Sequence, residues 1–372
     1  MISVVLILSG IFYALIILLS YYGWKRTKTF FVDGIDLKTK VSVIIPARNE
    51  EMNILQCLKS LAQQSFPKNL FEIIVVDDKS EDGTSDVVKN WIDNHPVNTK
   101  IIFPENGTGK KNALNEGIKI ATGELIVTTD ADCTMGKDWL STIVSYYEKS
   151  SPDLLAGMVA LKEENNFLTS FQSLELTGLT AIGAAGIYFR QPLLCNGANL
   201  AYRKNIFESV GGYNLSKESA SGDDTMLMFR IAKQKPGSVH FLKSDEATVY
   251  TNTASSLQDL FRQRRRWGSK VLGQKNYLSI LIALAAFLFH VSLVGALILS
   301  AAHIVSWEIF LALIVIKIIP EIILLSDALS FSGWTKSLPT IFLSQIIYPF
   351  YLVAAVLLSQ TGSYNWKGRI VK

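Results

Sequence analysis

Two carboxylates stand two residues apart just after a short apolar run that is typical of a strand: Asp130 and Asp132 follow residues 124–128. A hard divalent cation takes oxygen ligands from one or two carboxylates and from substrate phosphates. Two carboxylates held together repel each other unless a cation joins them. Because Asp78 also ends an apolar run, the pattern predicts a site for a divalent cation and a diphosphate. An Asp-rich turn is the simpler alternative.

A second acidic pair, Asp223 and Asp224, precedes a mostly apolar, helix-like stretch over residues 226–232. Asp is a common helix N-cap residue, because its carboxylate accepts hydrogen bonds from the first amides of the helix. A carboxylate in a cleft can instead act as a general base that takes a proton from a reacting hydroxyl. The sequence leaves both roles open.

Basic residues occur at two further places. Lys110 and Lys111 begin a helix-like stretch, and either a diphosphate contact or a solvated helix start accounts for them. The preceding residues resemble a P-loop, but Pro104 stands where that motif needs its first glycine, and no GxGxxG follows the first strand. A P-loop ATPase and a dehydrogenase are therefore not expected. The basic run 262–266 lies before an apolar segment, where such runs usually mark topology or lipid contact.

Alternating strand-like and helix-like segments must hold these side chains in place. The predicted strands cover residues 41–45, 71–76, 100–103 and 124–128, and the predicted helices cover 50–63, 81–91 and 110–121. Such alternation predicts an α/β domain with a mainly parallel sheet and right-handed crossovers. Ligands bind beyond the carboxyl ends of such strands. The polar clusters 46–50, 77–80 and 130–132 should therefore share one edge of the sheet.

Composition separates this domain from two apolar ends. The chain has 372 residues, enough for about two to three domains. Only 18% of the residues are charged, below the ~25% of an ordinary soluble domain. All but eight of the 68 charged residues lie between Lys25 and Lys275. The net charge of +4 is small and mixed in sign, which argues against a nucleic-acid partner.

The apolar ends predict an integral membrane protein. Residues 1–24 carry no charge and are long enough to cross a bilayer. Basic residues follow this stretch instead of preceding it, which predicts a retained anchor ending in the cytosol rather than a signal peptide. Apolar runs recur in the region 276–360, which predicts two or three transmembrane helices there. The run 306–325 contains Lys317 and Glu321, four apart and able to pair; whether it crosses fully, and on which side the basic tail 361–372 lies, stays open.

Six motifs in order carry a resemblance over residues 41–267: Asp77-Asp78-x-Ser80, Gly109-Lys-Lys-Asn-Ala-Leu-Asn115, Asp130-x-Asp132, Asn196-Gly-Ala-Asn199, Gly222-Asp-Asp224 and Gln263-x-x-Arg266-Trp267. Together they resemble membrane-embedded glycosyltransferase family 2, whose nucleotide-sugar domain has the GT-A fold. The apolar flanks resemble the branch that includes cellulose, hyaluronan and poly-N-acetylglucosamine synthases and ceramide glucosyltransferase. The resemblance implies a cytosolic GT-A domain over 38–270, with a donor half over 38–135 and an acceptor half over 136–270.

The resemblance also implies roles for the donor-side residues. The loop that holds the nucleoside would contain Ala47, Arg48 and Glu50, and Asp78 would contact the base. Lys110 or Lys111 would lie near the diphosphate. Asp130 and Asp132 match the family's DxD motif, with Asp132 as the direct ligand of Mg²⁺ or Mn²⁺.

On the acceptor side, Asp224 matches the catalytic base, and Asp223 departs from the more usual Glu. Gln263, Arg266 and Trp267 match the QxxRW element, which closes over the diphosphate and shapes the acceptor site. The expected activity is metal-dependent, inverting transfer from a nucleotide-sugar, in the first instance a UDP-sugar, to a lipid-like acceptor hydroxyl at the cytoplasmic membrane.

Two alternatives remain open at this point. One is a processive polysaccharide synthase that extends a glycan acceptor, and the other is an inactive nucleotide-sugar-binding subunit of a membrane complex. The sugar and the oligomeric state are not determined. The apolar stretch 167–189, with Glu175 as its one charge, is either a helix at the bilayer surface, in contact with membrane lipids, or a buried core helix.

Overall fold

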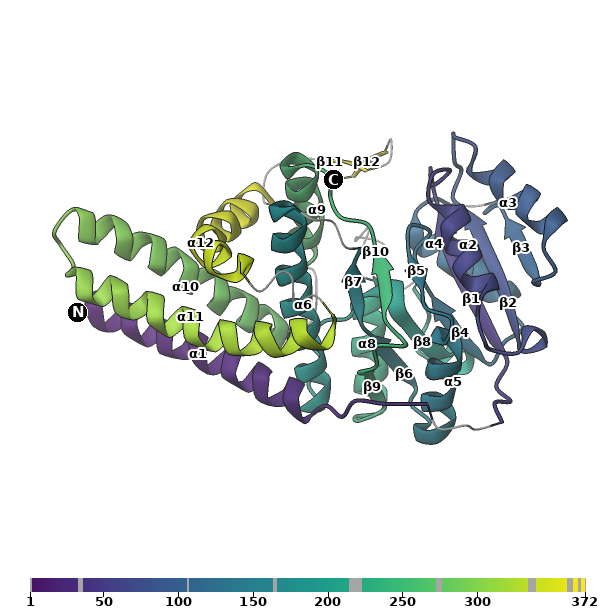
Figure 1. Ribbon diagram of the computed structural model, residues 1–372, viewed down its shortest axis with the longest axis horizontal. Helices are drawn as coiled ribbons and strands as arrows, with labels where there is room; N and C mark the ends of the chain where they lie inside the picture. The colour runs from purple at the N-terminus through teal and green to yellow at the C-terminus, as the bar shows by residue number, and fades with distance from the viewer. Residues whose placement is uncertain are drawn as a thin grey trace.

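The computed structural model combines an α/β domain with a set of long apolar helices (Figure 1). It describes residues 2–32, 36–105, 107–162, 166–213, 223–271, 276–333, 339–359, 364–366 and 369–371. The glycine before Asp223, the side chain of Asp223 and all but two short strands of the tail 361–372 lie outside this description.

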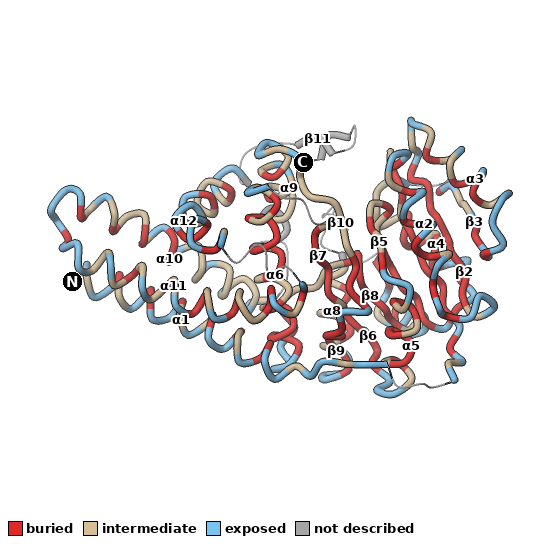
Figure 2. The backbone as a smooth tube through the Cα atoms, in the orientation of Figure 1, coloured by how far each residue is buried: buried red, intermediate tan, exposed pale blue. Residues whose placement is uncertain are grey.

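A seven-stranded sheet forms the core of the α/β domain. Its spatial order is β3 (Thr99–Ile102), β2 (Phe71–Asp77), β1 (Val41–Ala47), β4 (Leu125–Thr128), β8 (Leu200–Arg203), β6 (Leu154–Gly157) and β9 (Val239–Leu242). The first four strands are mutually parallel, whereas β8 runs antiparallel to both of its neighbours. β1, β2 and β4 are rich in β-branched and apolar residues and are almost entirely buried (Figure 2). The prediction of a mainly parallel α/β sheet is confirmed.

Two of the three helices between these strands begin later than the pattern predicts, and the third begins at Lys110 as predicted. The observed bounds are α2 (Ile54–Ala62), α3 (Thr84–Asn94) and α4 (Lys110–Ile120). The predicted helix start at residue 50 is instead a turn, in which the amides of Asn53 and Ile54 both donate to the Glu50 carbonyl. Likewise β1 continues through Pro46, because the strand stays in register with β2 as far as Ala47 opposite Asp77.

A smaller sheet and further helices complete the domain. The small sheet has the order β5 (Thr134–Met135), β10 (Val249–Thr251) and β7 (Val159–Leu161). The remaining helices of the domain are α5 (Trp139–Ser150), α7 (Lys204–Ser209) and α8 (Asp223–Gln234), with short 3-10 turns at Lys68–Leu70 and Gly197–Asn199. Two short strands, β11 (Tyr364–Trp366) and β12 (Arg369–Val371), pair near the C-terminus.

Four helices among the described residues are long and apolar enough to span a membrane: α1 (Ile2–Arg26), α10 (Tyr277–Ala301), α11 (Trp307–Phe331) and α12 (Thr340–Ser359). The segment 306–325, whose crossing the sequence left open, thus lies in a helix of spanning length from Trp307 onward. In Figure 1, α1, α10 and α11 run alongside one another away from the sheet domain, whereas α12 is seen partly end-on. α12 packs against α10 and also against α6 and α9.

Two helices lie between the sheet domain and the long helices: α6 (Phe167–Tyr188) and α9 (Leu257–Val271) (Figure 1). α6 packs against α1 and α11 on one side and against β7 and β9 on the other. Of the two alternatives for residues 167–189, the structure therefore favours a buried helix, placed between the two parts of the molecule.

Charged residues inside the helical part are paired. Lys317 donates to Glu321 at 2.9 Å, as their spacing predicts, and also to Gln345 of α12. The hydroxyl of Tyr13 in α1 donates to Glu321 at 2.6 Å. Since an unpaired charge in an apolar environment is costly, these contacts fix how α1, α11 and α12 face one another.

One buried carboxylate links neighbouring strands of the large sheet through hydrogen bonds. Glu72 of β2 is 3% exposed and accepts hydrogen bonds from Ser42, from both the amide and the hydroxyl of Thr122, and from Lys100 at 2.8 Å. Burial by itself raises the pKa of Glu72, but these donors outweigh burial and lower the pKa to about 2. The ionised carboxylate thus stabilises the folded state.

The Glu72→Gln variant should lose this stabilisation. The pKa of Glu72 in the folded state lies below its ordinary value of 4.5. The stability that the ionised carboxylate gives to the wild type is therefore present above pH 4.5 and is lost as the pH falls towards 2. We expect the variant to be less stable by about 2 kcal/mol at pH 7, and its stability to change less with pH over this window. Denaturant unfolding as a function of pH measures both. Glu116→Gln, on the surface of α4, is the control, and an equal loss of stability in the two variants would contradict this role for Glu72.

Candidate functional site

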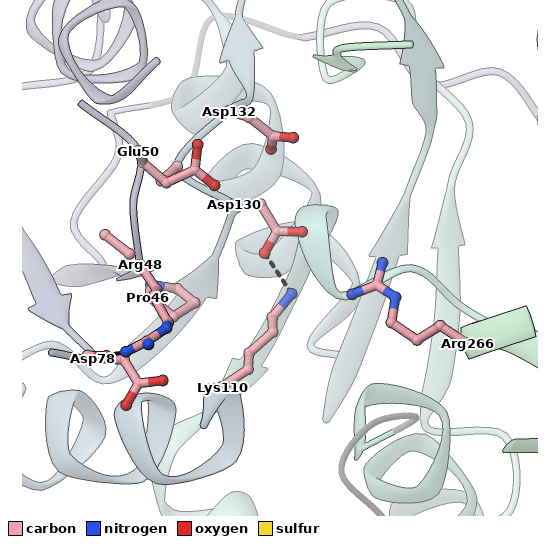
Figure 3. Close-up of a pocket in the computed structure, with 10 residues that line it drawn as sticks. Pro46, Arg48, Glu50, Asp78, Lys110, Asp130, Asp132 and Arg266 are labelled. Atoms are coloured by element: carbon pink, nitrogen blue, oxygen red, sulfur yellow. Dashed lines mark hydrogen bonds and ion pairs between the residues drawn. The ribbon is translucent and has the colours of Figure 1, made fainter. Parts of the chain in front are cut away.

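A cleft of about 190 Å³ lies where β1, β2 and β4 end, at the carboxyl edge of the parallel sheet. Most of the residues singled out from the sequence line it together with Pro46 and Ala131: Ala47, Arg48, Glu50, Asp78, Lys110, Asp130, Asp132 and Arg266 (Figure 3). The cleft therefore gathers carboxylates and cations from segments that lie up to about 220 residues apart.

Arg48 ties together the loops that follow β1 and β2. Its guanidinium is buried and donates to the backbone carbonyls of Asp78 at 2.8 Å and Lys79 at 2.6 Å. Asn49 and Lys79 both have positive φ, at 52° and 59°, so each chain turns sharply just past its strand. The Arg48 bonds hold these two turns side by side at the edge of the cleft.

Asp78 links the loop after β2 to the start of α4. Both of its carboxylate oxygens accept a hydrogen bond from the Gly109 amide, at 2.9 and 3.0 Å. Gly109 has φ of 101°, a conformation that glycine adopts far more readily than other residues. This turn sets the position from which Lys110 projects into the cleft.

Lys110 forms an ion pair with Asp130 at the centre of the cleft (Figure 3). Burial lowers the pKa of Lys110, but attraction to Asp130 and, more weakly, to Asp224 outweighs burial and raises it above the usual lysine value. The amine is therefore a fixed cation at neutral pH. Arg266 points from α9 toward the same pair, which adds a second cation to the cleft (Figure 3).

Asp132 lies beside the small sheet. Thr251 of β10 donates to its carboxylate at 3.3 Å, and Lys162, just after β7, donates to its backbone carbonyl at 3.3 Å. Carboxylate oxygens suit Mg²⁺ or Mn²⁺. No cluster of three or more His, Cys, Asp or Glu side chains able to hold a metal occurs among the described residues. A cation bound to Asp132 and Asp130 would therefore take its other ligands from substrate and water.

Asp224 lies in the first turn of α8. Its Oδ2 accepts a hydrogen bond from the Gly197 amide at 2.7 Å, and its Oδ1 accepts one from the Thr225 amide at 2.9 Å. A Cβ at position 197 would lie 2.9 Å from Oδ2, so glycine permits this close approach. The carboxylate thus bonds a separate backbone segment as well as its own helix, which goes beyond a simple N-cap role.

α9 presents different side chains to the cleft and to the helical part. Arg266 lines the cleft, whereas Arg264 forms a buried ion pair with Glu175 of α6, with Nε to Oε2 at 2.7 Å. The Arg264 guanidinium also lies 4.1 Å from the centre of the Trp267 ring and donates to Gln263. Gln263 and Trp267 are therefore held through Arg264 and are not among the residues that line the cleft.

Of the residues predicted from the sequence, Lys111 and Asp224 also do not line the cleft, and the side chain of Asp223 lies outside the described residues. The roles assigned to all these residues remain predictions. The sequence did not predict the contacts of Thr251 and Lys162 with Asp132, or that of Gly197 with Asp224. Thr251 and Lys162 are isolated polar residues at strand ends, where no local pattern marks them, but Gly197 lies within the Asn196-Gly-Ala-Asn199 motif and could have been examined for a close approach.

The sequence of the chain is similar to those of known glycosyltransferases. Residues 42–211 match the model of "Glycosyl transferase family 2". The chain is 29% identical over 258 residues to "Probable glycosyltransferase YdaM" of Bacillus subtilis, covering 66% of this chain and 59% of that protein. It is 27% identical over 249 residues to "Beta-monoglucosyldiacylglycerol synthase" of Nostoc sp., covering 64% of this chain and 50% of that protein. The chain thus matches about half of each relative's length.

A solved structure shares the fold over nearly the whole chain. The mannosyltransferase PcManGT from Pyrobaculum calidifontis, solved in complex with GDP-Man and Mn²⁺, aligns with a TM-score of 0.62 at 18% identity. The alignment covers 94% of this chain and 98% of that one. At this identity the likeness shows the fold: a GT-A core with apolar helices at both ends.

Proposed function

We propose that the protein transfers a sugar from a nucleotide-sugar, in the first instance a UDP-sugar, to a hydroxyl of a lipid-like acceptor in the membrane. The match of residues 42–211 to glycosyltransferase family 2 and the GT-A fold support this proposal. The observation that carries this proposal is the single cleft that combines Asp78, Asp130 and Asp132 with the cations Lys110 and Arg266. A nucleoside diphosphate needs such fixed cations, and a divalent metal needs such carboxylates.

The donor half of the cleft suits a nucleotide-sugar. We assign Ala47, Arg48 and Glu50 to the nucleoside and Asp78 to the base, since their two loops are held together at the edge of the cleft. Lys110 and Arg266 would face the diphosphate, where lysine acts as a point charge and arginine offers a planar fork. Of the two adjacent lysines, Lys110 is assigned this role because it lines the cleft.

The reaction we propose is a single displacement. The acceptor oxygen forms a bond to C1 of the sugar, the bond from C1 to the diphosphate oxygen breaks, and the hydroxyl proton passes to the Asp224 carboxylate. The Gly197 and Thr225 amides orient that carboxylate. Proton transfer to a positioned base contributes about 10²–10⁴ in rate. One in-line attack inverts C1, so an α-linked donor yields a β-linked product.

The carboxylate oxygens of Asp132 and Asp130 are suitable ligands for a divalent cation. Asp132 would bind it directly, with Asp130 beside it, and when bound it supplies positive charge for the departing diphosphate. In the structure Lys110 pairs with Asp130 while Thr251 donates to Asp132. The two carboxylates thus have different partners, which supports Asp132 as the closer ligand.

The membrane setting supports a lipid-like acceptor reached from the cytosolic side. Basic residues end α1 and precede α10, and both of these helix ends adjoin the sheet domain (Figure 1). We therefore propose that this domain faces the cytosol at the cytoplasmic membrane. α12 packs against α6 and α9, so we further propose that it lies across the domain side of the membrane and leaves the tail in the cytosol.

Replacing Asp224 by Asn should abolish transfer while donor binding survives, because the amide keeps the side-chain shape but takes up no proton. We expect the rate to fall at least ~100-fold. Transfer of radiolabelled sugar and equilibrium binding of UDP measure the two properties. Asp93→Asn, an exposed carboxylate on α3, is the control. Full transfer activity in the Asp224 variant would rule out its role as base.

Lys110→Met should weaken UDP binding about tenfold, equivalent to about 1.4 kcal/mol, because one cation facing the diphosphate is lost. Lys111→Met changes the neighbouring lysine that does not line the cleft and should have little effect. Calorimetric titration with UDP compares them. Equal losses in the two variants would contradict the assignment to Lys110.

Chelation by EDTA should stop turnover, and Mg²⁺ or Mn²⁺ should restore it. Asp132→Asn should raise the metal concentration needed for half-maximal rate more than Asp138→Asn, a control at the start of α5. The release of free nucleoside diphosphate, followed over a panel of UDP- and GDP-sugars, reports turnover. Undiminished rates in the chelator would contradict metal dependence, and no release with any donor would favour the inactive-subunit alternative.

The size of the product separates single transfer from processive synthesis. We expect one sugar per acceptor, because few apolar helices are available to form a translocation path for a polymer. A ladder or polymer on a gel would instead favour the processive synthase.

A further inference from the structure

A second pocket, here called the helix pocket, lies between α1, α6, α11 and α12 and has a volume of about 100 Å³. Most of its wall is apolar, including Ile17, Leu174 and Leu324. It reaches from α6, beside the sheet domain, to Tyr13 near the middle of α1. A water molecule takes up ~30 Å³, so the pocket has the size of a small headgroup rather than of a whole lipid.

Polar side chains gather within this apolar wall: Tyr13, Glu175, Glu321, Ser344, Gln345 and Tyr348. Most of them bond to one another or to neighbouring cations. Ser344 differs, because it is 5% exposed and its buried Oγ has no hydrogen-bond partner in the structure. A buried hydroxyl without a partner is costly in an apolar environment, so this group points to a ligand that carries a polar atom.

The charges around the helix pocket favour an uncharged ligand. Its charged lining residues are two carboxylates, Glu175 and Glu321. Their cations, Arg264 and Lys317, are already bonded to them, at 2.7 and 2.9 Å. A phosphate headgroup would have to displace a carboxylate from its cation, whereas a hydroxyl can donate to a carboxylate and exchange hydrogen bonds with Ser344.

One helix connects the helix pocket to the cleft. Glu175 lines the helix pocket and pairs with Arg264, which stacks on Trp267. Arg266, on the same turn of α9, lines the cleft. A molecule held against Glu175 thus lies on the Arg264 side of α9, whereas Arg266 lines the cleft on another side of the same helix.

We infer that the helix pocket binds a lipid with an uncharged, hydroxyl-bearing headgroup, of the diacylglycerol type, and not a lipid phosphate. The apolar walls hold the start of the chains, while Ser344 and the paired carboxylates bond the headgroup hydroxyl. This inference does not rest on the proposed function: α9 separates the helix pocket from the cleft, so the lipid held there is taken to be a bound lipid of the helical part and not the acceptor during transfer. The binding itself stands on the pocket alone.

The test uses the full-length protein in detergent, without donor. Dioctanoylglycerol and a polyprenyl phosphate of similar chain length are titrated, and bound lipid is counted by native mass spectrometry. Ser344→Phe fills the pocket, and Ile346→Phe, on the 65% exposed face of the same helix, is the matched control. We expect dioctanoylglycerol to bind the wild type and the control equally and to bind Ser344→Phe at least tenfold more weakly, with the phosphate weaker than dioctanoylglycerol on the wild type.

UDP binding at the cleft checks that each variant is folded. A diacylglycerol carrying a photoreactive diazirine provides a measurement on the wild type alone, and label on peptides of the four lining helices, α1, α6, α11 or α12, supports the inference. Equal binding to folded Ser344→Phe and wild type, tighter binding of the phosphate, or label confined to other helices overturns it. Lipid binding without release of nucleoside diphosphate from any donor would defeat only the proposed function, and release without lipid binding would defeat only this inference.

Discussion

The register of β1 against its parallel neighbours is the constraint on which the cleft depends. β1 pairs with β2 up to Ala47 opposite Asp77, and with β4 up to Ile44 opposite Thr128. Parallel strands in this register all end at one edge, so the polar residues after each strand must meet there. The bonds of Arg48 to the loop after β2, and of Asp78 to Gly109, then hold the edge in a fixed shape before any ligand is bound.

The electrostatics of the cleft follow from that shape. Lys110 and Asp130 neutralise each other, and Arg266 approaches from the opposite side on α9 (Figure 3). A diphosphate with a divalent cation would bring charges of both signs, so each partner of the Lys110–Asp130 pair can exchange its contact for one with the ligand. Paired charges destabilise the folded state less than isolated carboxylates in the same place would. This explains how so many ionisable groups can share one small cleft.

Charges are also paired at the interface between the sheet domain and the long helices, where the side chains are more deeply buried. Arg264 and Glu175 are each 7% exposed, and Lys317 and Glu321 form a second buried pair between the long helices. Burying a lone charge is expensive, so the Arg264–Glu175 pair favours one arrangement of α9 against α6. The Lys317–Glu321 pair lies within α11 and does the same through its contacts with Gln345 of α12 and Tyr13 of α1. α9 contributes to both regions through neighbouring residues, and it thereby couples the position of Arg266 to the packing of α6 and α12.

The sequence alone determined the alternation of strands and helices, the apolar ends, the pairing of Lys317 with Glu321 and the clusters that follow β1, β2 and β4, because each of these depends on local periodicity or spacing. Only the tertiary structure decided which of two adjacent lysines lines the cleft, that Arg264 turns away from Arg266, and that Thr251 and Gly197 bond Asp132 and Asp224. These contacts join residues between 27 and about 120 positions apart, and no local pattern encodes them. They depend instead on which helix face and which strand end the packing of the whole chain brings together.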